Sequence, residues 1–452
     1  MARKLFGTDG VRGKANLWPM TSEVALKLGR GLAHLFKNHK HRKVVIGKDT
    51  RRSGYMLENA LSSGVCSAGA EAILLGPLPT PAIAFITLAM RADAGAVISA
   101  SHNPYYDNGI KFFDHTGFKL PDEQELKLEQ FIENDDFQKN PPVCEEIGKA
   151  HRVEDAPGRY IEHLKSTFPK NLKLDGLKLV IDCAHGAAYR VSPVVFEELG
   201  AEVTRLGVHP NGLNINEQCG ALHPQHLSAK VKEMGADLGI ALDGDADRVV
   251  LCDEKGEVLD GDVILAIAAS EMKKQNLLKK NTVVSTVMSN FGLERFLSEE
   301  GIRLLRTQVG DRYVVEAMRE QGFNLGGEQS GHIIFSDYAT TGDGTLAALQ
   351  ILSIMKKTGQ TLSELRKIMS SIPQVLVNVK VKERKDLGLF PSLQKKVSEA
   401  EQRLKGQGRV LLRYSGTEPL VRIMAEGENE SLVNEILDEL KEEVVKSLGA
   451  AA

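Results

Sequence analysis

The sequence predicts an α/β protein with three consecutive α/β domains that contain mixed sheets, followed by a smaller C-terminal α+β domain. The chain has 452 residues, and because single domains usually span ~100–200 residues, three or four domains are expected. Through most of the chain, short apolar strands alternate with helices, which is typical of a sheet covered by helices. The last ~80 residues instead run strand, helix, strand, strand, helix, which favours an α+β unit. The expected boundaries are 1–150, 151–258, 259–370 and 371–452.

The first unit shows helical periodicity and continuous apolar runs in alternation. The expected elements are a helix at 22–36, a strand at 43–47, a helix at 56–69, and strands at 71–75 and 94–98. An acidic helix around 122–135 follows, and Pro141 and Pro142 then give a linker signal.

The second and third units repeat this order. The second begins near Arg159 and is expected to contain strands at 177–182, 201–204 and 238–242, with helices at 192–199 and 225–234. The third begins near Gly261, with a strand at 282–287 and a final helix at 345–357. Similar length and order suggest a threefold structural repeat. In the last unit, the expected elements are strands at 375–381, 409–414 and 421–425 and helices at 391–404 and 430–447.

The composition excludes several classes of protein. With 42% hydrophobic and 26% charged residues, the chain resembles soluble globular proteins. The net charge of -3 and the even mixing of charges argue against nucleic-acid and membrane partners. The five scattered cysteines lack C-x-x-C spacing, which favours a reducing compartment over disulfides or zinc. No signal-peptide pattern or run of ~18 apolar residues is present, so we expect a cytoplasmic protein.

The strongest chemical motif follows the strand at 238–242. Asp243, Asp245 and Asp247 occupy alternate positions, and on an extended segment such side chains point the same way. Three converging carboxylates repel one another unless a cation lies between them, and Mg²⁺ prefers oxygen ligands. A calcium-binding EF-hand would need glycine where Arg248 stands. We therefore expect a magnesium site, with a plain polar turn as the alternative.

A serine-containing motif, residues 99–104, follows the strand at 94–98. Ligand sites in α/β sheets lie beyond the carboxyl ends of the strands. Ser101 is a candidate phosphoryl acceptor because His102 and Lys111 supply possible bases nearby. The Asn-Pro pair in the motif is also a common turn signal, so an ordinary turn stays an alternative.

Four polar loops offer further binding groups. The segment 413–422 combines two arginines, two hydroxyls and a glycine, which suits a phosphate, although a hairpin turn is the alternative. The segment 326–332 could bind sugar hydroxyls, the segment 6–13 places Arg12 on a flexible loop, and the segment 50–54 adds cations. The segments 326–332 and 6–13, each taken alone, are compatible with an ordinary turn. Neither a P-loop nor a credible dinucleotide fingerprint is present.

Together these motifs resemble those of the α-D-phosphohexomutase family. Five occur in the family's order along the whole chain, at 6–13, 99–104, 243–248, 326–332 and 413–422. The resemblance implies four domains around a central cleft. The form of the first motif, Gln329 and Gly416 resemble the branch that acts on glucosamine phosphates, whereas Leu5 departs from the aromatic residue expected there.

The resemblance also implies a mechanism. Phosphorylated Ser101 would donate its phosphoryl group to glucosamine 6-phosphate, and the 1,6-bisphosphate would turn around and return its other phosphate. One Mg²⁺ would be held by Ser101, Asp243, Asp245 and Asp247. Lys111, His102 and His332 are the implied acid/base candidates, and Arg12 would stabilise the transferring group.

The implied substrate is a small phosphosugar, and the protein would be a monomer or a homodimer. The residues implied to bind the substrate are Arg248, Glu328, Ser330, Arg413, Ser415, Gly416, Thr417 and Arg422. Two alternatives stay open. A phosphatase could use the same serine and metal but would not need a remote phosphate site, and the intact Ser101 and Lys111 argue against a non-catalytic binding protein.

Overall fold

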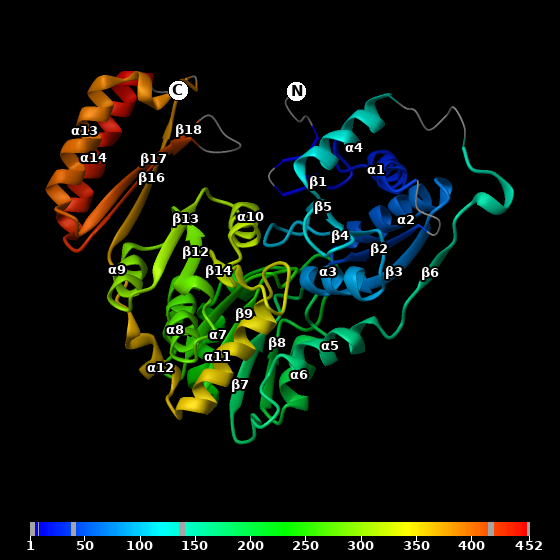
Figure 1. Cartoon of the computed structure of the whole chain (residues 1–452), viewed down its shortest axis with the longest axis horizontal. Coiled ribbons are helices and arrows are strands. Elements are labelled where there is room, and N and C mark those ends of the chain that lie inside the picture. The colour runs from blue at the N-terminus through cyan, green and yellow to red at the C-terminus, as the bar shows by residue number, and fades with distance from the viewer. Residues whose placement is uncertain are drawn as a thin grey trace.

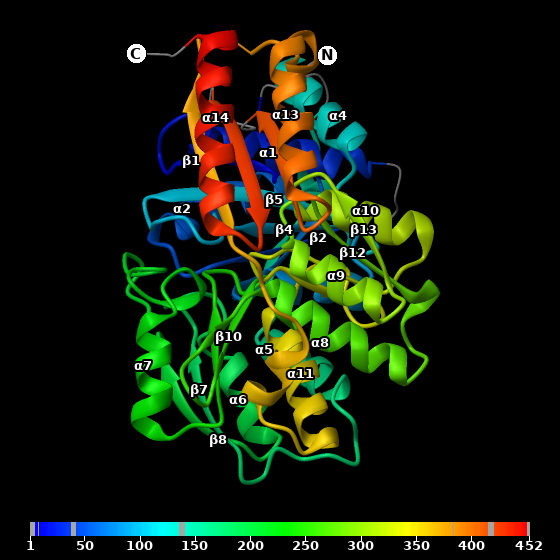
Figure 2. The ribbon, with the colours of Figure 1, turned by 90° about the vertical axis from the view of Figure 1, so that its left-hand side faces the viewer.

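The computed structural model describes residues 5–7, 9–37, 42–134, 141–382, 384–414 and 420–449. It has three α/β units followed by a small C-terminal domain, as expected (Figure 1). The first unit and the C-terminal domain form two lobes, and the second and third units lie below them (Figure 1). In Figure 2 the C-terminal domain lies in front of the first unit. Within the described residues, no helix is both long and apolar enough to cross a membrane.

The first unit contains a six-stranded sheet in the order β1-β5-β4-β2-β3-β6. The strands are β1 (Val11–Lys14), β2 (Lys43–Lys48), β3 (Glu71–Pro77), β4 (Ala94–Ile98), β5 (Asp107–Asp114) and β6 (Ala150–Arg152). The helices are α1 (Ser22–Leu35), α2 (Arg52–Ser67), α3 (Thr80–Ala89), α4 (Asp122–Asn134) and the short 3₁₀ turn η2 (Cys144–Glu146). Arg12 lies in β1 opposite Gly109 of β5, so the expectation that it lies on a flexible loop is wrong.

The second unit has a five-stranded sheet in the order β11-β10-β9-β7-β8. Its strands are β7 (Lys178–Asp182), β8 (Glu202–Leu206), β9 (Leu238–Leu242), β10 (Val249–Asp253) and β11 (Val258–Leu259). Its helices are α5 (Ala156–Ser166), α6 (Ser192–Glu198), α7 (Gln225–Met234) and the 3₁₀ turn η3 (Gly220–Leu222).

The third unit has a four-stranded sheet in the order β13-β12-β14-β15. Its strands are β12 (Thr282–Thr286), β13 (Arg303–Thr307), β14 (Leu325–Gly327) and β15 (Ile333–Phe335). Its helices are α8 (Gly261–Lys274), α9 (Phe291–Glu299), α10 (Asp311–Gln321), α11 (Gly344–Thr358) and α12 (Leu362–Leu365), with 3₁₀ turns η4 (Lys279–Asn281) and η5 (Arg366–Ile368). N-cap side chains accept backbone hydrogen bonds at the starts of α8, α9, α11 and α12; for example, Asp343 accepts a hydrogen bond from the N–H of Leu346 at 3.0 Å.

The three α/β units repeat one topology. In each, two parallel strands are joined through helices to a third parallel strand, and a fourth strand turns back antiparallel to the third. The corresponding sheet orders are β5-β4-β2-β3, β10-β9-β7-β8 and β15-β14-β12-β13. The predicted threefold structural repeat is thus confirmed. The turns between the third and fourth strands carry the serine motif, the aspartate motif and the motif at 326–332.

The C-terminal domain is a three-stranded antiparallel sheet in the order β16-β18-β17, covered by two helices. Its elements are β16 (Gln374–Lys380), β17 (Gly408–Tyr414), β18 (Leu420–Gly427), α13 (Pro391–Leu404), α14 (Glu430–Leu448) and the 3₁₀ turn η6 (Leu387–Leu389). Val421, Ile423 and Ala425 alternate along β18 and are buried in a core that belongs to this domain alone. One larger apolar cluster instead runs continuously through the three α/β units.

Candidate active site

Ser101 lies at the turn between β4 and β5 and is almost fully buried. Its φ of +50° is a left-handed conformation that residues other than glycine, asparagine and aspartate rarely adopt. In this conformation the Oγ donates a hydrogen bond to Asp243 Oδ2 at 2.6 Å and lies 3.4 Å from His102 Nδ1. The first and second α/β units therefore meet at the candidate nucleophile.

Asp243, Asp245 and Asp247 converge as predicted. All three are buried, and one carboxylate oxygen of each lies within 4.8 Å of the others. Burial, together with the neighbouring carboxylates of Asp247 and Asp245, raises the pKa of Asp243 to about 8. In the part of the chain that the structure describes, the buried Oδ1 atoms of Asp245 and Asp247 have no hydrogen-bond partner, which fits ligands for a divalent cation. Antiparallel β9 and β10 flank the turn, so it is not an EF-hand.

Lys111 projects from β5 into the same cluster. Its Nζ lies 3.3 Å from Asp245 Oδ2, 3.5 Å from Asp247 Oδ2 and 3.2 Å from Asp9 Oδ2. Burial alone would lower the pKa of Lys111, but the carboxylates of Asp245, Asp9 and Asp247 raise it above its ordinary value. The side chain is therefore held as a cation beside the candidate metal site.

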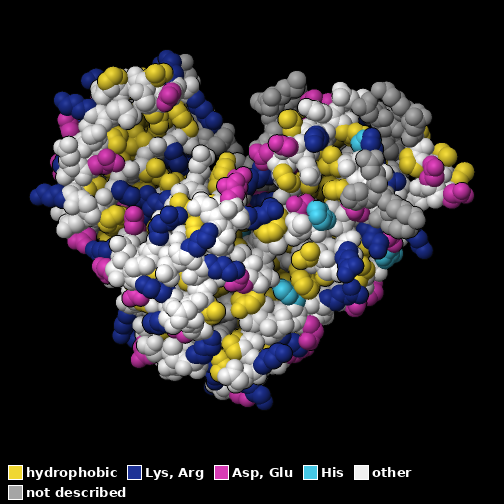
Figure 3. Space-filling view, in the orientation of Figure 1, with side chains coloured by type: hydrophobic (Ala, Val, Ile, Leu, Met, Phe, Trp, Pro, Cys, Tyr) yellow, Lys and Arg dark blue, Asp and Glu magenta, His cyan; other side chains and the backbone are white. Residues whose placement is uncertain are grey.

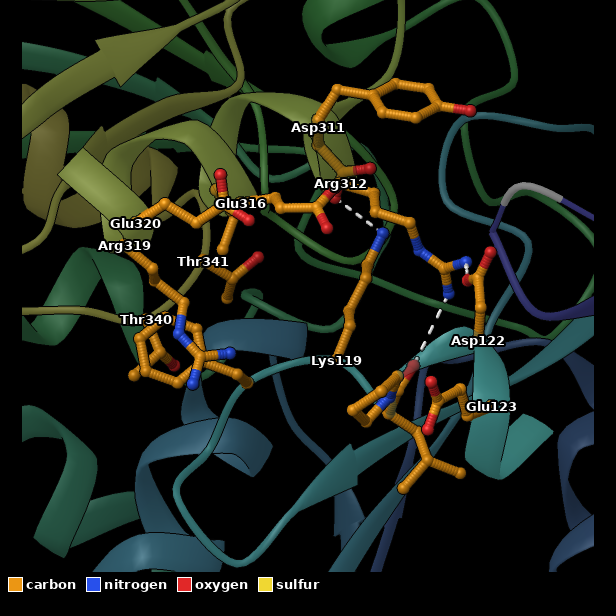
Figure 4. Close-up of a pocket in the computed structure, with 15 residues that line it drawn as sticks. Lys119, Asp122, Glu123, Asp311, Arg312, Glu316, Arg319, Glu320, Thr340 and Thr341 are labelled. Atoms are coloured by element: carbon orange, nitrogen blue, oxygen red, sulfur yellow. Dashed lines mark hydrogen bonds and ion pairs between the residues drawn. The ribbon is translucent and has the colours of Figure 1, made fainter. Parts of the chain in front are cut away.

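Three residues continue these contacts to the third unit. Lys119 Nζ lies 2.5 Å from Asp9 Oδ1. It also lies 2.5 Å from Oδ2 of Asp311, the first residue of α10 (Figure 4). His332 then lies between Asp311 and Asp247, with a ring nitrogen 3.7 Å from an oxygen of each. Alternating charges thus link all three α/β units. Asp311 and Lys119 also line a cavity of about 660 Å³ beside α10.

Two arginines and two histidines lie next to the aspartate cluster, and the pKa values of both histidines are shifted. Arg12 pairs with Asp9, and the Arg248 backbone N–H donates to Asp243 Oδ1 at 3.2 Å. Burial, and then the charges of Arg248 and Arg12, lower the pKa of His102 to about 4. Burial would also lower the pKa of His332, but the carboxylates of Asp247 and Asp311 raise it. At neutral pH, His102 is therefore the more available proton acceptor.

The motif at 326–332 forms a tight hairpin between β14 and β15. Glu328 is buried, and its Oε1 accepts a hydrogen bond from the Gly310 N–H at 3.1 Å. Ser330 is exposed at the turn, and His332 is buried at the start of the return strand. Burial would lower the pKa values of Arg248 and His332 beside the aspartate cluster, but neighbouring carboxylates, among them that of Glu328, raise both.

Two arginines face each other on the C-terminal sheet. Arg413 of β17 is paired directly with Arg422 of β18, and like charges in this position are destabilising. Burial and the facing Arg422 lower the pKa of Arg413, and among the described residues the buried Nε of each arginine has no hydrogen-bond partner. A bound anion would offset the repulsion between the two arginines and could accept hydrogen bonds from them. Ser415, Gly416 and Thr417 lie outside the described residues.

The surface is deeply notched between the first unit and the C-terminal domain, with Lys and Arg side chains gathered at its base (Figure 3). The ends of β17 and β18 that carry Arg413 and Arg422 are directed toward this notch (Figure 1). The arrangement suits a small molecule with an anionic group at each end.

Family models match the chain in four consecutive segments. They describe the alpha/beta/alpha domains I, II and III and the C-terminal domain of phosphoglucomutase/phosphomannomutase. The matched residues are 3–139, 158–256, 260–372 and 376–443. A crystal structure of a phosphoglucomutase/phosphomannomutase family protein from Burkholderia thailandensis has a TM-score of 0.82 and 25% identity, covering 99% of this chain and 98% of the other.

Full-length relatives are more similar. The phosphoglucosamine mutase of Citrifermentans bemidjiense is 58% identical over 451 residues, covering 100% of this chain and 99% of that protein. The phosphoglucosamine mutase of Geobacter sp. strain M21 is 59% identical with the same coverage. Aspergillus fumigatus N-acetylphosphoglucosamine mutase, crystallised with GlcNAc-6P and magnesium, shares the fold at a TM-score of 0.70 and 19% identity, over 98% of this chain and 96% of the other. The chain belongs to the phosphohexomutase family, within the group of phosphoglucosamine mutases, which are isomerases.

Sequence reasoning missed three charged residues that join the units. Asp9 lies inside the motif at 6–13, where a carboxylate three residues before Arg12 could have indicated an ion pair. Lys119 and Asp311 are 192 residues apart in the chain, and neither stands in a recognisable motif. Their pairing depends on how the first and third units pack.

Proposed function

We propose that this protein interconverts glucosamine 6-phosphate and glucosamine 1-phosphate through a phosphorylated Ser101 and a 1,6-bisphosphate intermediate. The observation that carries the proposal is the position of the Ser101 Oγ, 2.6 Å from Asp243 Oδ2 of the buried aspartate cluster. Full-length identity of 58% to a phosphoglucosamine mutase supports the choice of substrate. The scattered free cysteines are compatible with the cytoplasmic location that we also propose.

Mg²⁺, held by Asp243, Asp245, Asp247 and the phosphorylated Ser101, would supply positive charge that stabilises the transferring phosphoryl group. The magnesium in the Aspergillus fumigatus structure of the same fold supports this choice of ion. Arg12 and Lys111 add protein cations at the same place.

In the first half-reaction, a sugar hydroxyl forms a new bond to phosphorus while the bond from phosphorus to Ser101 Oγ breaks. The hydroxyl proton leaves to a protein base, for which His102 and His332 are the proposed acceptors. Burial would lower the pKa of Lys111, but its carboxylate partners raise it above the ordinary value, so the side chain stays charged. Lys111 would therefore stabilise negative charge on the departing Oγ. The second half-reaction reverses these steps at the other end of the sugar.

Between the half-reactions, the bisphosphate must exchange its two ends. Glu328 and Ser330 are proposed to hold sugar hydroxyls in both orientations, with Arg248 beside them. The remote phosphate would be bound by Arg413 and Arg422, together with Ser415, Gly416 and Thr417. This second anion site suits a mutase, because a phosphatase needs to hold only the phosphate that it removes.

The substrate is tested by comparing glucosamine 6-phosphate, glucose 6-phosphate and mannose 6-phosphate on one preparation with phosphorylated Ser101. We expect glucosamine 6-phosphate to give the highest kcat/KM and glucose 6-phosphate to react slowly. A site complementary to the amino group at C2 leaves polar partners unpaired when a hydroxyl takes its place. A higher kcat/KM for another hexose phosphate would contradict the substrate assignment. Stoichiometric release of inorganic phosphate would instead indicate a phosphatase.

The remote phosphate site is tested with Arg422→Ala. Because Arg422 would contact the phosphate in both the ground state and the transition state, its loss should mainly raise KM. A charge-assisted hydrogen bond contributes roughly 1.5–3 kcal/mol, so KM should rise about tenfold to a hundredfold. Arg403→Ala is the control, since Arg403 pairs with Glu439 on the helices of the same domain. An unchanged KM with a collapsed kcat would reassign Arg422 to the chemical step.

A further inference from the structure

Arg51 is an arginine of the first unit whose guanidinium hydrogen-bonds the backbone of the loop that carries Ser101. It follows β2, is fully buried, and directs its guanidinium at the backbone of residues 101–107, here called the serine loop. Its Nη2 donates to the carbonyl oxygens of Ser101 and Asn103, each at 2.8 Å. Its Nη1 donates to the carbonyls of Pro104 and Asp107.

The remaining guanidinium N–H is also used. Arg51 Nε donates to Asp49 Oδ2 at 2.8 Å, so all five guanidinium donors are occupied by the protein. Arg51 therefore has no donor left for a phosphate. From the sequence, the segment 50–54 is expected to add cations. Arg51 is such a cation, but its hydrogen bonds go to the protein itself.

The ion pair between Arg51 and Asp49 is also linked to the backbone N–H of Ser101. The Ser101 N–H donates to Ser99 Oγ at 2.9 Å, and Ser99 Oγ donates to Asp49 Oδ2 at 2.7 Å. Hydrogen bonds thus form a closed ring from the Ser101 N–H through Ser99, Asp49 and Arg51 to the Ser101 carbonyl. Both peptide groups of Ser101 are fixed by one buried ion pair.

A residue from the second unit completes these contacts. Asn216 Nδ2 donates to the Ser101 carbonyl at 2.9 Å and to the Asn103 carbonyl at 3.1 Å. Gly244 allows this approach, because a Cβ there would lie 2.5 Å from the Ser101 carbonyl oxygen and 2.8 Å from Asn216 Nδ2. The serine loop of the first unit is thereby held against the aspartate turn of the second.

We propose that Arg51 and Asn216 are positioning residues that fix Ser101 in its left-handed conformation and so aim its Oγ at the aspartate cluster. The proposal rests on the phosphoserine role proposed above. An unfavourable conformation such as the +50° φ of Ser101 persists only where its surroundings impose it. Phosphoryl transfer requires the Oγ at the same place in both half-reactions, and a misplacement of ~1 Å can cost about a hundredfold in rate.

The test compares Arg51→Lys, Asn216→Ala and the control Asn324→Ala. Lysine keeps the charge of Arg51 but lacks the planar fork that reaches several acceptors at once. Asn324 is a buried asparagine of the third unit whose Nδ2 donates to the Leu277 carbonyl at 2.9 Å. Asn324→Ala therefore removes the same kind of hydrogen bond as Asn216→Ala, but not one to the serine loop. Steady-state kcat and KM, the thermal unfolding midpoint, and single-turnover transfer from phosphorylated Ser101 are measured for each variant, with transfer followed by intact mass.

We expect Arg51→Lys to lower kcat and the transfer rate about a hundredfold, with little change in KM. Asn216→Ala, which removes one side-chain donor, should lower both about tenfold. Asn324→Ala should lower the unfolding midpoint but leave kcat unchanged. If Asn216→Ala keeps its kcat, or loses it only as Asn324→Ala does, the proposal is wrong, and this variant decides the matter even where Arg51→Lys does not fold. If the wild-type phosphoserine transfers nothing to sugar phosphates, it is the proposed function that fails instead.

Discussion

Ser101→Ala is expected to lose nearly all turnover, with kcat about 10⁴-fold or more below that of the wild type. The physical reason is that the transferred phosphoryl group has to be bonded to the enzyme between half-reactions, and alanine offers no oxygen. The Ser101 Oγ, buried beside Asp243 at 2.6 Å, cannot be replaced by a neighbouring hydroxyl without moving the serine loop. Turnover is measured with glucosamine 6-phosphate, and peptide fragmentation should map phosphate to Ser101 in the wild type only.

Ser192→Ala is a suitable control for this variant. Ser192 is a fully buried serine in α6, and its Oγ hydrogen-bonds Thr345 Oγ1 at 2.6 Å. Its replacement should lower stability by about 1 kcal/mol and leave kcat unaffected. Full activity in Ser101→Ala, or phosphate mapped to another residue of the active wild type, would remove the basis of the phosphoserine mechanism.

Exhaustive chelation of divalent ions is expected to abolish turnover, and added Mg²⁺ should restore it. Three buried carboxylates lie within 4.8 Å of one another, and a divalent cation would compensate their repulsion and the charge of the phosphate. Asp245→Asn should raise the Mg²⁺ concentration needed for half-maximal activity by at least tenfold, since even partners of metal ligands contribute that much. Calorimetric titration with Mg²⁺ measures the same change without relying on activity.

Asp253→Asn provides the matched control for the metal experiment. Asp253 is a fully buried carboxylate at the end of β10, where its Oδ1 accepts hydrogen bonds from the N–H groups of Lys255 and Glu257. Its replacement should cost stability and leave the Mg²⁺ dependence as it is. Undiminished activity after complete chelation would show that the carboxylate cluster serves another purpose.

Periodicity in the sequence predicted most of the fold, and its exceptions have physical causes. The helix at 225–234 and the strand at 238–242 coincide with α7 and β9. Helix α3, in contrast, is apolar on nearly all sides and buried, so it lacks the 3.6-residue alternation that marks a surface helix. The pairing of β1 with β5 is also absent from local patterns, because it depends on a strand that lies almost a hundred residues further along the chain.

The aspartate cluster and Ser101 could be predicted as candidates because their chemistry is concentrated in short segments. Arg51 could not be assigned correctly from sequence, since an arginine in a polar loop after a strand looks like a ligand contact until its acceptors are known. Lys119 and Asp311 gave no signal at all. Their 2.5 Å contact exists only because the first and third units pack together, and single-sequence patterns carry no information on that packing.

The repeated topology has a consequence for how activity is lost. Each copy of the repeat contributes one specialised hairpin turn, bearing the nucleophile, the carboxylates or the sugar-facing loop. The three copies meet at one cluster of charged side chains, and the covalent chain keeps them at high effective concentration. Catalysis is then an all-or-none property of their docking. Because one apolar cluster runs through all three units, conditions that loosen its packing should silence the enzyme while the C-terminal domain, which has a core of its own, remains folded.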